Sequence, residues 1–188
     1  MKHIAIFASG NGSNAQVIIN HFKEHPHIQV SLVLTNNPSA GILRIAQQEK
    51  IISAILSKEA LQDEANVSKI LKALQIDYII LAGFLQKVPD FVVQQYKNKI
   101  VNIHPALLPK YGGKGMYGQK VHEAVIADKA TQTGITIHLV NEKYDDGTII
   151  LQKEIDIDAN DTPETIANKV QKLEHTWYSQ AIETLINN

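Results

Sequence analysis

The sequence predicts an α/β fold in which a single doubly wound, mostly parallel sheet carries helices on both faces and ends in an antiparallel pair. Short apolar runs alternate with longer amphipathic stretches through the first half of the chain. Strands that are apolar on both faces are typical of parallel sheets covered by helices. The short connection between the last two expected strands is typical of an antiparallel pair instead. We expect one domain, residues 1–188, because no repeat or linker interrupts the pattern.

Four strands separated by helices account for the first half of the predicted fold. The apolar runs place strands at residues 3–8, 28–35, 51–56 and 77–82. Amphipathic stretches place helices at residues 14–25, at about 42–50, and from a cap at Ser57 through apolar positions as far as Leu74. Crossovers between parallel strands are right-handed in nearly all proteins, so these units wind into an open sheet with helices on both faces.

The pattern changes after Ile100. A strand ends at residues 101–104, and a glycine-rich loop over residues 105–118 leads into a helix at residues 119–128. Two further strands, residues 135–140 and 148–155, are joined by a turn over residues 141–147. The last helix begins near Thr162-Pro163-Glu164, which combines a capping residue with a first-turn proline, and ends at about residue 186.

The amino-acid composition argues against several classes of function. The net charge is −1 and Arg44 is the only arginine, so no basic stripe favours nucleic acid as a partner. The chain has no cysteine, which excludes a disulfide scaffold and thiolate catalysis. No apolar run approaches the roughly 18 residues of a membrane span. We therefore expect a soluble, cytoplasmic protein.

A glycine turn, Ser9-Gly10-Asn11-Gly12-Ser13-Asn14, follows the first expected strand and opens a helix. Such a turn presents backbone amides and the positive end of the helix to an anion, typically a phosphate. Its spacing matches a relaxed dinucleotide fingerprint, but the second strand ends Leu34-Thr35-Asn36-Asn37, without the acidic residue that would hold a ribose. NAD is therefore not expected, and a phosphate monoester is. The alternative is a tight turn that binds nothing.

Asn102, His104 and Pro105 end a strand that we expect in the interior of the sheet. Ligands of open α/β sheets bind at the carboxyl ends of the strands. An asparagine amide can donate to a developing oxyanion, and a histidine two residues further along an extended chain points to the same side. Pro105 restricts His104 to extended backbone, which helps to fix its direction. The alternative is a histidine with a purely structural role, whose hydrogen bonds are satisfied at the end of the strand.

Asp145 and Asp146 lie in the turn between the last two strands. Two acids before a glycine most often form a solvated turn. A carboxylate beside a histidine would instead orient the ring and raise its pKa. The sequence does not by itself place either aspartate near His104.

The remaining histidines do not predict a metal site. His21, His25 and His27 cluster, but no carboxylate framework or regularly spaced third ligand accompanies them. His138 lies within an expected strand, where a structural role and a supporting role near a site are both open. We expect no bound metal.

Five segments together resemble the glycinamide ribonucleotide formyltransferases, folate-dependent enzymes of purine synthesis within the wider folate formyltransferase group. The resemblance covers essentially the whole chain. The segments are IAIFASGNGSN at 4–14, DYIILAGFL at 77–85, IVNIHPALLPKYGG at 100–113, TGITIHLVNEKYDDGTIILQ at 133–152 and VQKLEH at 170–175. NIHPALLP marks the wider group, whereas SGNGSN and the short length indicate the phosphorylated glycinamide substrate. The fold that this implies is a Rossmann-like formyltransferase variant.

The resemblance implies a role for named residues. Asn102, His104 and Asp145 would be catalytic, with Asp145 chosen over Asp146 because the family's turn has one aspartate followed by two glycines. The resemblance assigns the phosphate to Gly12, Ser13 and Asn14, the ribose hydroxyls to Glu174, and the folate to Lys58, Leu85, Gln86, Lys87, Val88, Asn102 and Val140. The co-substrate would be 10-formyltetrahydrofolate, with no metal and no NAD.

Two departures from the family pattern concern the folate site and the central loop. Gln86 stands where many relatives carry a basic residue beside the folate, so one charge contact is expected to be missing. The loop at residues 112–118 is rich in glycine, and we expect it to act as a mobile flap over the substrate.

The expected reaction is direct attack of the glycinamide amine on the formyl carbon. Asn102 and a protonated His104 would donate hydrogen bonds to the tetrahedral oxyanion, and Asp145 would keep His104 charged. The alternatives are a formyltetrahydrofolate deformylase, in which water replaces the amine, and a ligand-binding domain of the same fold without catalysis. A formyltransferase for initiator tRNA or a sugar nucleotide would need more chain. We expect small-molecule substrates, no nucleic acid or membrane, and a monomer or homodimer.

Overall fold

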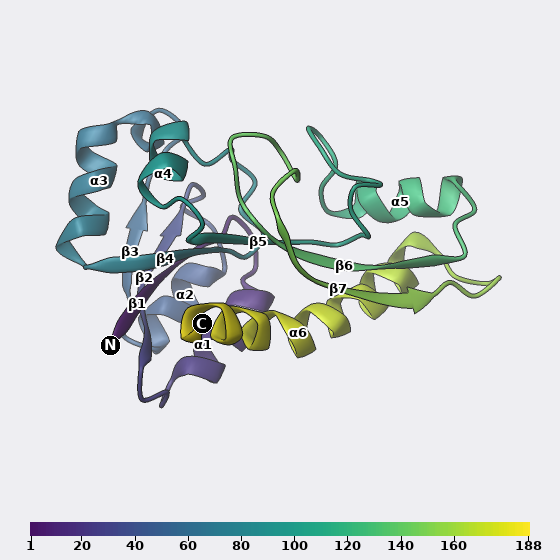
Figure 1. Cartoon of the computed structure of the whole chain (residues 1–188), viewed down its shortest axis with the longest axis horizontal. Helices are drawn as coiled ribbons and strands as arrows, with labels where there is room; N and C mark the ends of the chain where they lie inside the picture. The colour runs from purple at the N-terminus through teal and green to yellow at the C-terminus, as the bar shows by residue number, and fades with distance from the viewer. The chain divides into compact units, whose positions relative to one another are not determined.

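Seven strands and six α-helices make up the protein, whose computed structural model describes all of residues 1–188. The strands are β1 (Lys2–Phe7), β2 (Ile28–Thr35), β3 (Ile52–Ile55), β4 (Ile76–Leu81), β5 (Ile100–His104), β6 (Gln132–Leu139) and β7 (Ile149–Asp156). The helices are α1 (Ser13–Phe22), α2 (Ile42–Gln48), α3 (Glu64–Ala73), α4 (Asp90–Gln95), α5 (Gln119–Ala127) and α6 (Pro163–Asn187), with a 3₁₀ turn, η1, at Ala60–Gln62. Figure 1 labels the strands and the α-helices.

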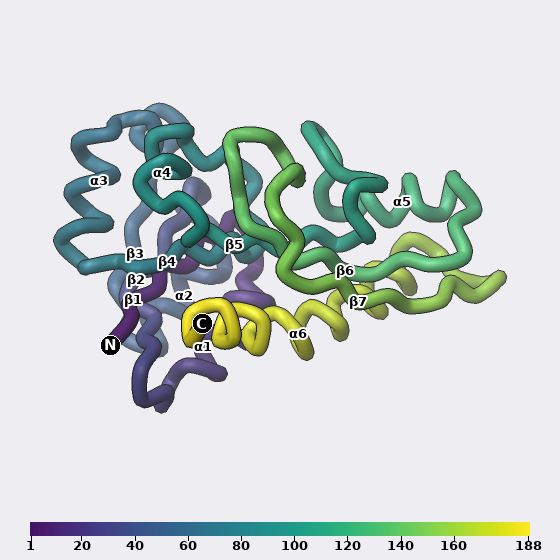
Figure 2. Tube along the Cα trace, viewed as in Figure 1, coloured from purple at the N-terminus to yellow at the C-terminus, as the bar shows by residue number.

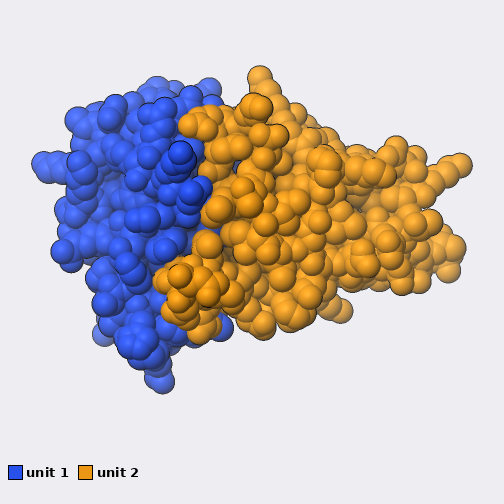
Figure 3. Space-filling view, viewed as in Figure 1, with its two compact units in different colours: residues 1–101 blue, residues 102–188 orange.

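The strands form one sheet in the order β3-β2-β1-β4-β5-β6-β7. β1 pairs in parallel with β2 and β4, and β2 pairs in parallel with β3. β6 and β7 are antiparallel, with Thr133 opposite Ile155 and Ile137 opposite Leu151. The predicted fold class, a mostly parallel sheet with an antiparallel C-terminal pair, is therefore confirmed. The chain divides into two compact units, residues 1–101 and residues 102–188 (Figure 3).

The first unit builds its core on β1, whose residues Ile4 to Phe7 are fully buried. α1 and α2 pack together against β2, and α3 packs on β4 and α4. In Figure 1 the first pair of helices lies on one side of these strands and the second pair on the other. This follows from the strand order, because the chain reverses its direction across the sheet after β3 and right-handed crossovers then place the helices on the opposite face.

Two predicted helix boundaries in the first unit are wrong and one helix was not predicted, each for a local reason. α1 ends at Phe22 and not at His25, because the His25 ring accepts hydrogen bonds from the amides of His27 and Ile28 and so turns the chain into β2. Ser57 caps only the 3₁₀ turn through the Ala60 amide. α3 has its own cap, since Asp63 accepts from the Asn66 amide. α4 was not predicted, because six residues show too little periodicity.

The second unit packs α6 against β6, β7 and α5. α6 begins with a capping box in which Thr162 and Thr165 exchange hydrogen bonds. Figure 2 shows the chain between β6 and β7 as a long turn, which carries Asp145. None of the helices combines the length with the apolar character that a membrane span needs.

Candidate active site

The glycine turn of the first unit has the backbone geometry of a tight strand-to-helix connection. Gly12 has φ +85° and ψ +22°, a left-handed conformation, and it precedes α1 without any side-chain cap. A Cβ at Gly12 would lie 3.1 Å from Ile42, so a side chain at this left-handed position would be strained and would crowd Ile42. The first amides of an α-helix have no acceptor within the helix. The turn therefore offers amides to an anion, and Ser13 adds an exposed hydroxyl.

Ser9 ties this turn to two other strand ends, a role that sequence reasoning missed. Its Oγ donates to Asn36 Oδ1 at 2.5 Å and accepts from the Leu85 amide at 2.9 Å. Asn37 Nδ2 donates to the Ser9 carbonyl at 3.2 Å. The side chain is almost fully buried. Ser9 thus holds the segment that begins at Leu85 at the carboxyl ends of β1 and β2, and only its position before the glycines could have signalled this.

The four residues assigned to the folate in this segment differ in what they can offer. Leu85 exposes 59% of its surface, which is unusual for a leucine, and supplies apolar contact area. Gln86 is half-buried, whereas Val88 is buried at 4% exposure and can reach a ligand only through its backbone. The Lys87 ammonium lies 2.7 Å from Asp90 Oδ1, so its charge is already paired. Lys58 is exposed in the turn before η1.

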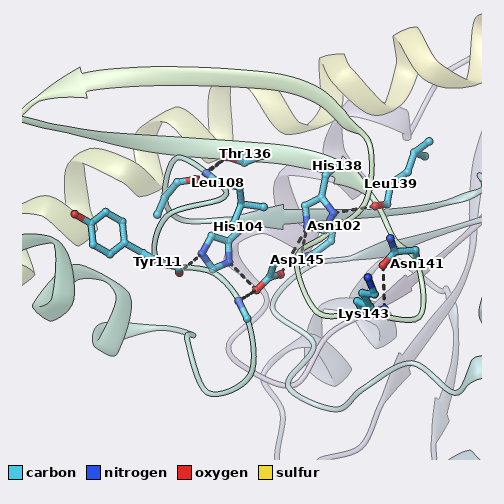
Figure 4. Close-up of polar contacts among 12 residues, drawn as sticks. Asn102, His104, Leu108, Tyr111, Thr136, His138, Leu139, Asn141, Lys143 and Asp145 are labelled. Carbon is cyan, nitrogen blue, oxygen red and sulfur yellow. Dashed lines mark hydrogen bonds and ion pairs between the residues drawn. The ribbon is translucent and has the colours of Figure 1, made fainter.

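A polar cluster in the second unit contains the buried His104 and His138 and the half-buried Asn102 and Asp145 (Figure 4). Asn102 and His104 come from β5, and alternation along a strand directs both to one face. His104 is 3% exposed and His138, on β6, is 1% exposed. His104 Nδ1 lies 3.6 Å from Asp145 Oδ2, and His138 Nε2 lies 3.7 Å from Asp145 Oδ1. One carboxylate therefore faces two buried imidazoles.

The hydrogen bonds of His138 orient Asn102. His138 Nδ1 donates to the Leu139 carbonyl at 2.9 Å, because a carbonyl can only accept. Its Nε2 is then free to accept, and Asn102 Nδ2 lies 3.1 Å from it. This contact fixes which end of the Asn102 amide is the NH₂ group. The second hydrogen of that group is available for another acceptor.

The structure separates the two aspartates of the turn. Asp145 has φ +52°, a left-handed conformation that is uncommon for a residue other than glycine, and its Oδ2 accepts from the Gly113 amide at 2.9 Å. Asp146 is exposed, accepts from Asn141 at 3.3 Å and lies 3.8 Å from Lys143. Asp145 is the aspartate beside His104.

Burial decides the protonation of the histidines. It lowers the pKa of His104 below the ordinary 6.5, although Asp145 and the Tyr111 carbonyl both act to raise it. The pKa of His138 is lowered for the same reason, against the Leu139 carbonyl and Asp145. The expectation that Asp145 keeps His104 charged is thus wrong for the free protein, because the loss of hydration outweighs one partly solvated carboxylate. His104 is mainly neutral at neutral pH.

His122, on α5, is a further buried histidine that the sequence did not single out. It is 5% exposed, and its Nδ1 has no hydrogen-bond partner. Burial lowers its pKa, and the neighbouring His104 lowers it further. No motif marks it, since a single histidine on a helix does not differ in sequence from one on the surface.

The loop that follows His104 is held by β6 and β7. The Thr136 hydroxyl donates to the Ala106 carbonyl at 2.7 Å and accepts from the Leu108 amide at 2.9 Å. Gln152 Nε2 donates to the Leu108 carbonyl at 2.9 Å and to the Thr136 hydroxyl at 2.8 Å. The Leu108–Pro109 peptide bond is cis. This network holds the chain between His104 and the glycine-rich loop.

The other assigned residues of the second unit lie on the turn, on α6 and in the loop. Val140 is half-buried immediately after β6. Glu174 is half-buried on α6, where its charge adds to burial in raising the pKa of Tyr178 well above the ordinary value. Within residues 112–118, Gly113, Gly115 and Gly118 all have positive φ. That backbone would be strained with other residues.

Comparison with known proteins identifies the family of the chain. The formyl transferase family matches residues 2–182. The chain is 37% identical to a phosphoribosylglycinamide formyltransferase of Bacillus subtilis (strain 168), covering 99% of this chain and 95% of the relative. The chloroplastic enzyme of that name from Arabidopsis thaliana is 38% identical, over 96% of this chain. The chain spans 64% of that relative's length and 61% of the Vigna unguiculata one.

Solved structures share the fold over nearly the whole chain. The phosphoribosylglycinamide formyltransferase of Bacillus halodurans has a TM-score of 0.88 and 37% identity, covering 98% of this chain and 95% of that one. A formyltetrahydrofolate deformylase from Pseudomonas syringae has a TM-score of 0.86 at 20% identity, covering 99% of this chain and 62% of that one, which shows a common fold alone. The chain belongs to the formyl transferase family.

Proposed function

We propose that the protein transfers a formyl group from 10-formyltetrahydrofolate to the amine of 5'-phosphoribosyl glycinamide, a step of purine biosynthesis. The observation that carries this proposal is that Asn102 and Asp145 lie around the buried His104 in a chain of the formyl transferase family. The 37% identity to the B. subtilis relative supports the phosphorylated substrate. The uncapped turn at Gly12 supports it independently, since it offers amides to a phosphate.

The binding assignments are part of this proposal. Gly12, Ser13 and Asn14 would hold the phosphate, and Glu174 would accept from the ribose hydroxyls. The folate would contact Leu85 through its exposed side chain and Val88 through its backbone. Lys58, Gln86, Lys87, Asn102 and Val140 would complete the folate site, in which Lys87 would have to leave Asp90 to contribute charge.

The chemistry of the cluster follows from its donors and acceptors. The amine attacks the formyl carbon and forms the new C–N bond, and the carbonyl oxygen becomes an oxyanion that accepts from Asn102 Nδ2. Neutral His104 takes the surplus proton of the attacking amine, and Asp145 stabilises the resulting imidazolium. His104 then returns the proton to the departing folate nitrogen as its bond to the formyl carbon breaks. The lowered pKa of His104 fits this order of proton transfers, because the residue must begin as a proton acceptor.

Folate production, followed by absorbance with and without phosphoribosyl glycinamide, tests the proposal. Turnover that requires the amine is the expected result. Turnover with water alone would identify a deformylase, and no turnover under either condition would identify a binding domain. Loss of turnover in Asn102→Ala, with an unchanged circular dichroism spectrum, would link the activity to the cluster. Removal of an oxyanion donor costs about 10²–10³ in rate.

The wider setting of the activity is also proposed. Its ligands would be small molecules and not nucleic acid or membrane, in line with the net charge of −1 and the single arginine. We propose a cytoplasmic monomer or homodimer. Sedimentation at several protein concentrations distinguishes the two states.

A further inference from the structure

The His104 ring is held by the backbone of Tyr111, a residue that has no part in the proposed reaction. His104 Nε2 lies 2.8 Å from the Tyr111 carbonyl oxygen (Figure 4). A carbonyl oxygen can only accept, so Nε2 carries a hydrogen whether the ring is neutral or charged. The neutral ring therefore has its lone pair on Nδ1. That nitrogen is the one 3.6 Å from Asp145 Oδ2.

The backbone of Tyr111 adopts a conformation that needs outside support. Its φ is +57°, in the left-handed region that a tyrosine seldom occupies. The chain is also tight at the next residue, because a Cβ at Gly112 would lie 2.5 Å from Leu108 Cδ2 and 3.2 Å from Asp145 Cβ. The direction of the Tyr111 carbonyl thus depends on contacts that hold this short segment in place.

The Tyr111 side chain supplies one such contact at its far end. The phenol Oη donates to Asp128 Oδ2 at 2.9 Å, and Asp128 is the C-cap residue of α5. Partial burial raises the pKa of the Tyr111 phenol, and the Asp128 carboxylate that accepts its hydrogen raises it further. One residue therefore contacts His104 through its backbone and α5 through its side chain.

We propose that Tyr111 is a positioning residue that fixes the tautomer of His104. The Tyr111 carbonyl keeps the hydrogen on His104 Nε2. The hydrogen bond from the Tyr111 phenol to Asp128 holds the residue, and therefore its carbonyl, in place. Nδ1 is then the only nitrogen of the His104 ring that exchanges a proton. This inference rests on the proposed function for its effect on rate, but the tautomer itself is independent of that function. Without the anchor the segment could relax and the neutral ring could place its hydrogen on either nitrogen.

The charged and titratable groups around His104 define what a pH profile would report. Asp145 faces it from the turn, His138 from β6 and His122 from α5. None of these is altered by replacing the Tyr111 phenol with a phenyl ring. A change in the acidic limb of the rate profile in Tyr111→Phe would therefore originate at His104 and its carbonyl partner.

The test compares Tyr111→Phe and Asp128→Ala, which remove opposite ends of the anchor, with Asp128→Asn, which keeps an acceptor oxygen. Nitrogen-15 spectra of the histidine rings are recorded above pH 7, and the His104 signals are identified by their loss in His104→Gln. The wild type and Asp128→Asn should show a protonated Nε2 and an unprotonated Nδ1. Tyr111→Phe and Asp128→Ala should show averaged shifts from mixed tautomers.

Activity provides the second measurement. Loss of one hydrogen bond should lower kcat roughly three- to tenfold in Tyr111→Phe and Asp128→Ala, without further loss in the double variant and with little change in either KM. Tyr78→Phe, on β4, is the matched control and should behave as the wild type. A wild-type tautomer together with a wild-type kcat in both single variants overturns the inference. If the wild type transfers no formyl group, the proposed function fails, and the spectra still decide the tautomer.

Discussion

Both compact units bury hydroxyl side chains, but only the second unit also buries imidazoles. In residues 1–101 the buried polar side chains are hydroxyls, those of Ser9, Thr35 and Ser68. Residues 102–188 bury three hydroxyls as well, those of Thr133, Thr136 and Ser179. They also bury the imidazoles of His104, His122 and His138. A phosphate turn needs only backbone amides and a glycine, so the first unit can keep an apolar core. The proton exchange that we propose uses a histidine whose pKa is lowered by burial, and burying such ionisable groups costs free energy.

This contrast predicts that changes in the second unit will affect the chemical step most strongly. Asp145→Asn keeps the size of the side chain and removes the charge that stabilises the His104 imidazolium. We expect kcat to fall by about 10²–10³, comparable to the loss of one electrostatic contact in a dry site. Asp146→Asn is the matched control, because Asp146 is exposed and pairs with Lys143. Equal kcat values for the two variants would contradict the assignment.

Changes in the glycine turn should instead affect binding. Gly12→Ala places a Cβ 3.1 Å from Ile42 at a left-handed residue and should displace the amides. We expect KM for the phosphorylated substrate to rise about tenfold, or about 1.4 kcal/mol, with a smaller change in kcat. Gly10→Ala is the control, since a Cβ there meets nothing within 4 Å and its φ is not positive. If Gly12→Ala lowered kcat and left KM unchanged, the distinction between a binding role for the first unit and a chemical role for the second would be wrong.

The pH dependence of the rate tests whether His104 begins neutral. Burial lowers its pKa below 6.5, so the acceptor form predominates above a midpoint that is more acidic than 6.5. We expect kcat/KM to rise with pH through that midpoint and then level off. In Asp145→Asn the midpoint should move further down, because the carboxylate that raises the pKa is gone. A residual rate that instead falls as pH rises through this range would indicate that the protonated form is required.

The smallest expected effect is on stability. Histidines whose folded pKa is lowered favour the neutral form, so the unfolded chain binds more protons below pH 6.5. Their contribution is fully present above pH 6.5 and is lost as the pH falls through the folded pKa values. The Tm should decline over this range, and His122→Leu should make the decline shallower. An unchanged slope in His122→Leu would contradict this prediction.

Sequence patterns predicted the strands better than the helix ends. β2 has the predicted bounds, residues 28–35, because its apolar run is long and is bounded by turn residues. The helix ends were misjudged where a side chain competes for the backbone, as the His25 ring does after α1 and Asp63 does before α3. Such hydrogen bonds depend on side-chain direction, which periodicity does not contain.

The same division applies to the site. The sequence alone determined that Asn102 and His104 share one face of a strand, because alternation along an extended chain is a local property. It also placed a glycine turn at the start of α1. The family resemblance favoured Asp145 over Asp146, and the tertiary structure places Asp145 beside His104. Only the tertiary structure decided that His122 and His138 are buried near it and that the Tyr111 carbonyl meets Nε2. These contacts and the lowered pKa of His104 depend on which groups the fold brings together and which it shields from water. The spacing of residues along the chain does not determine either property.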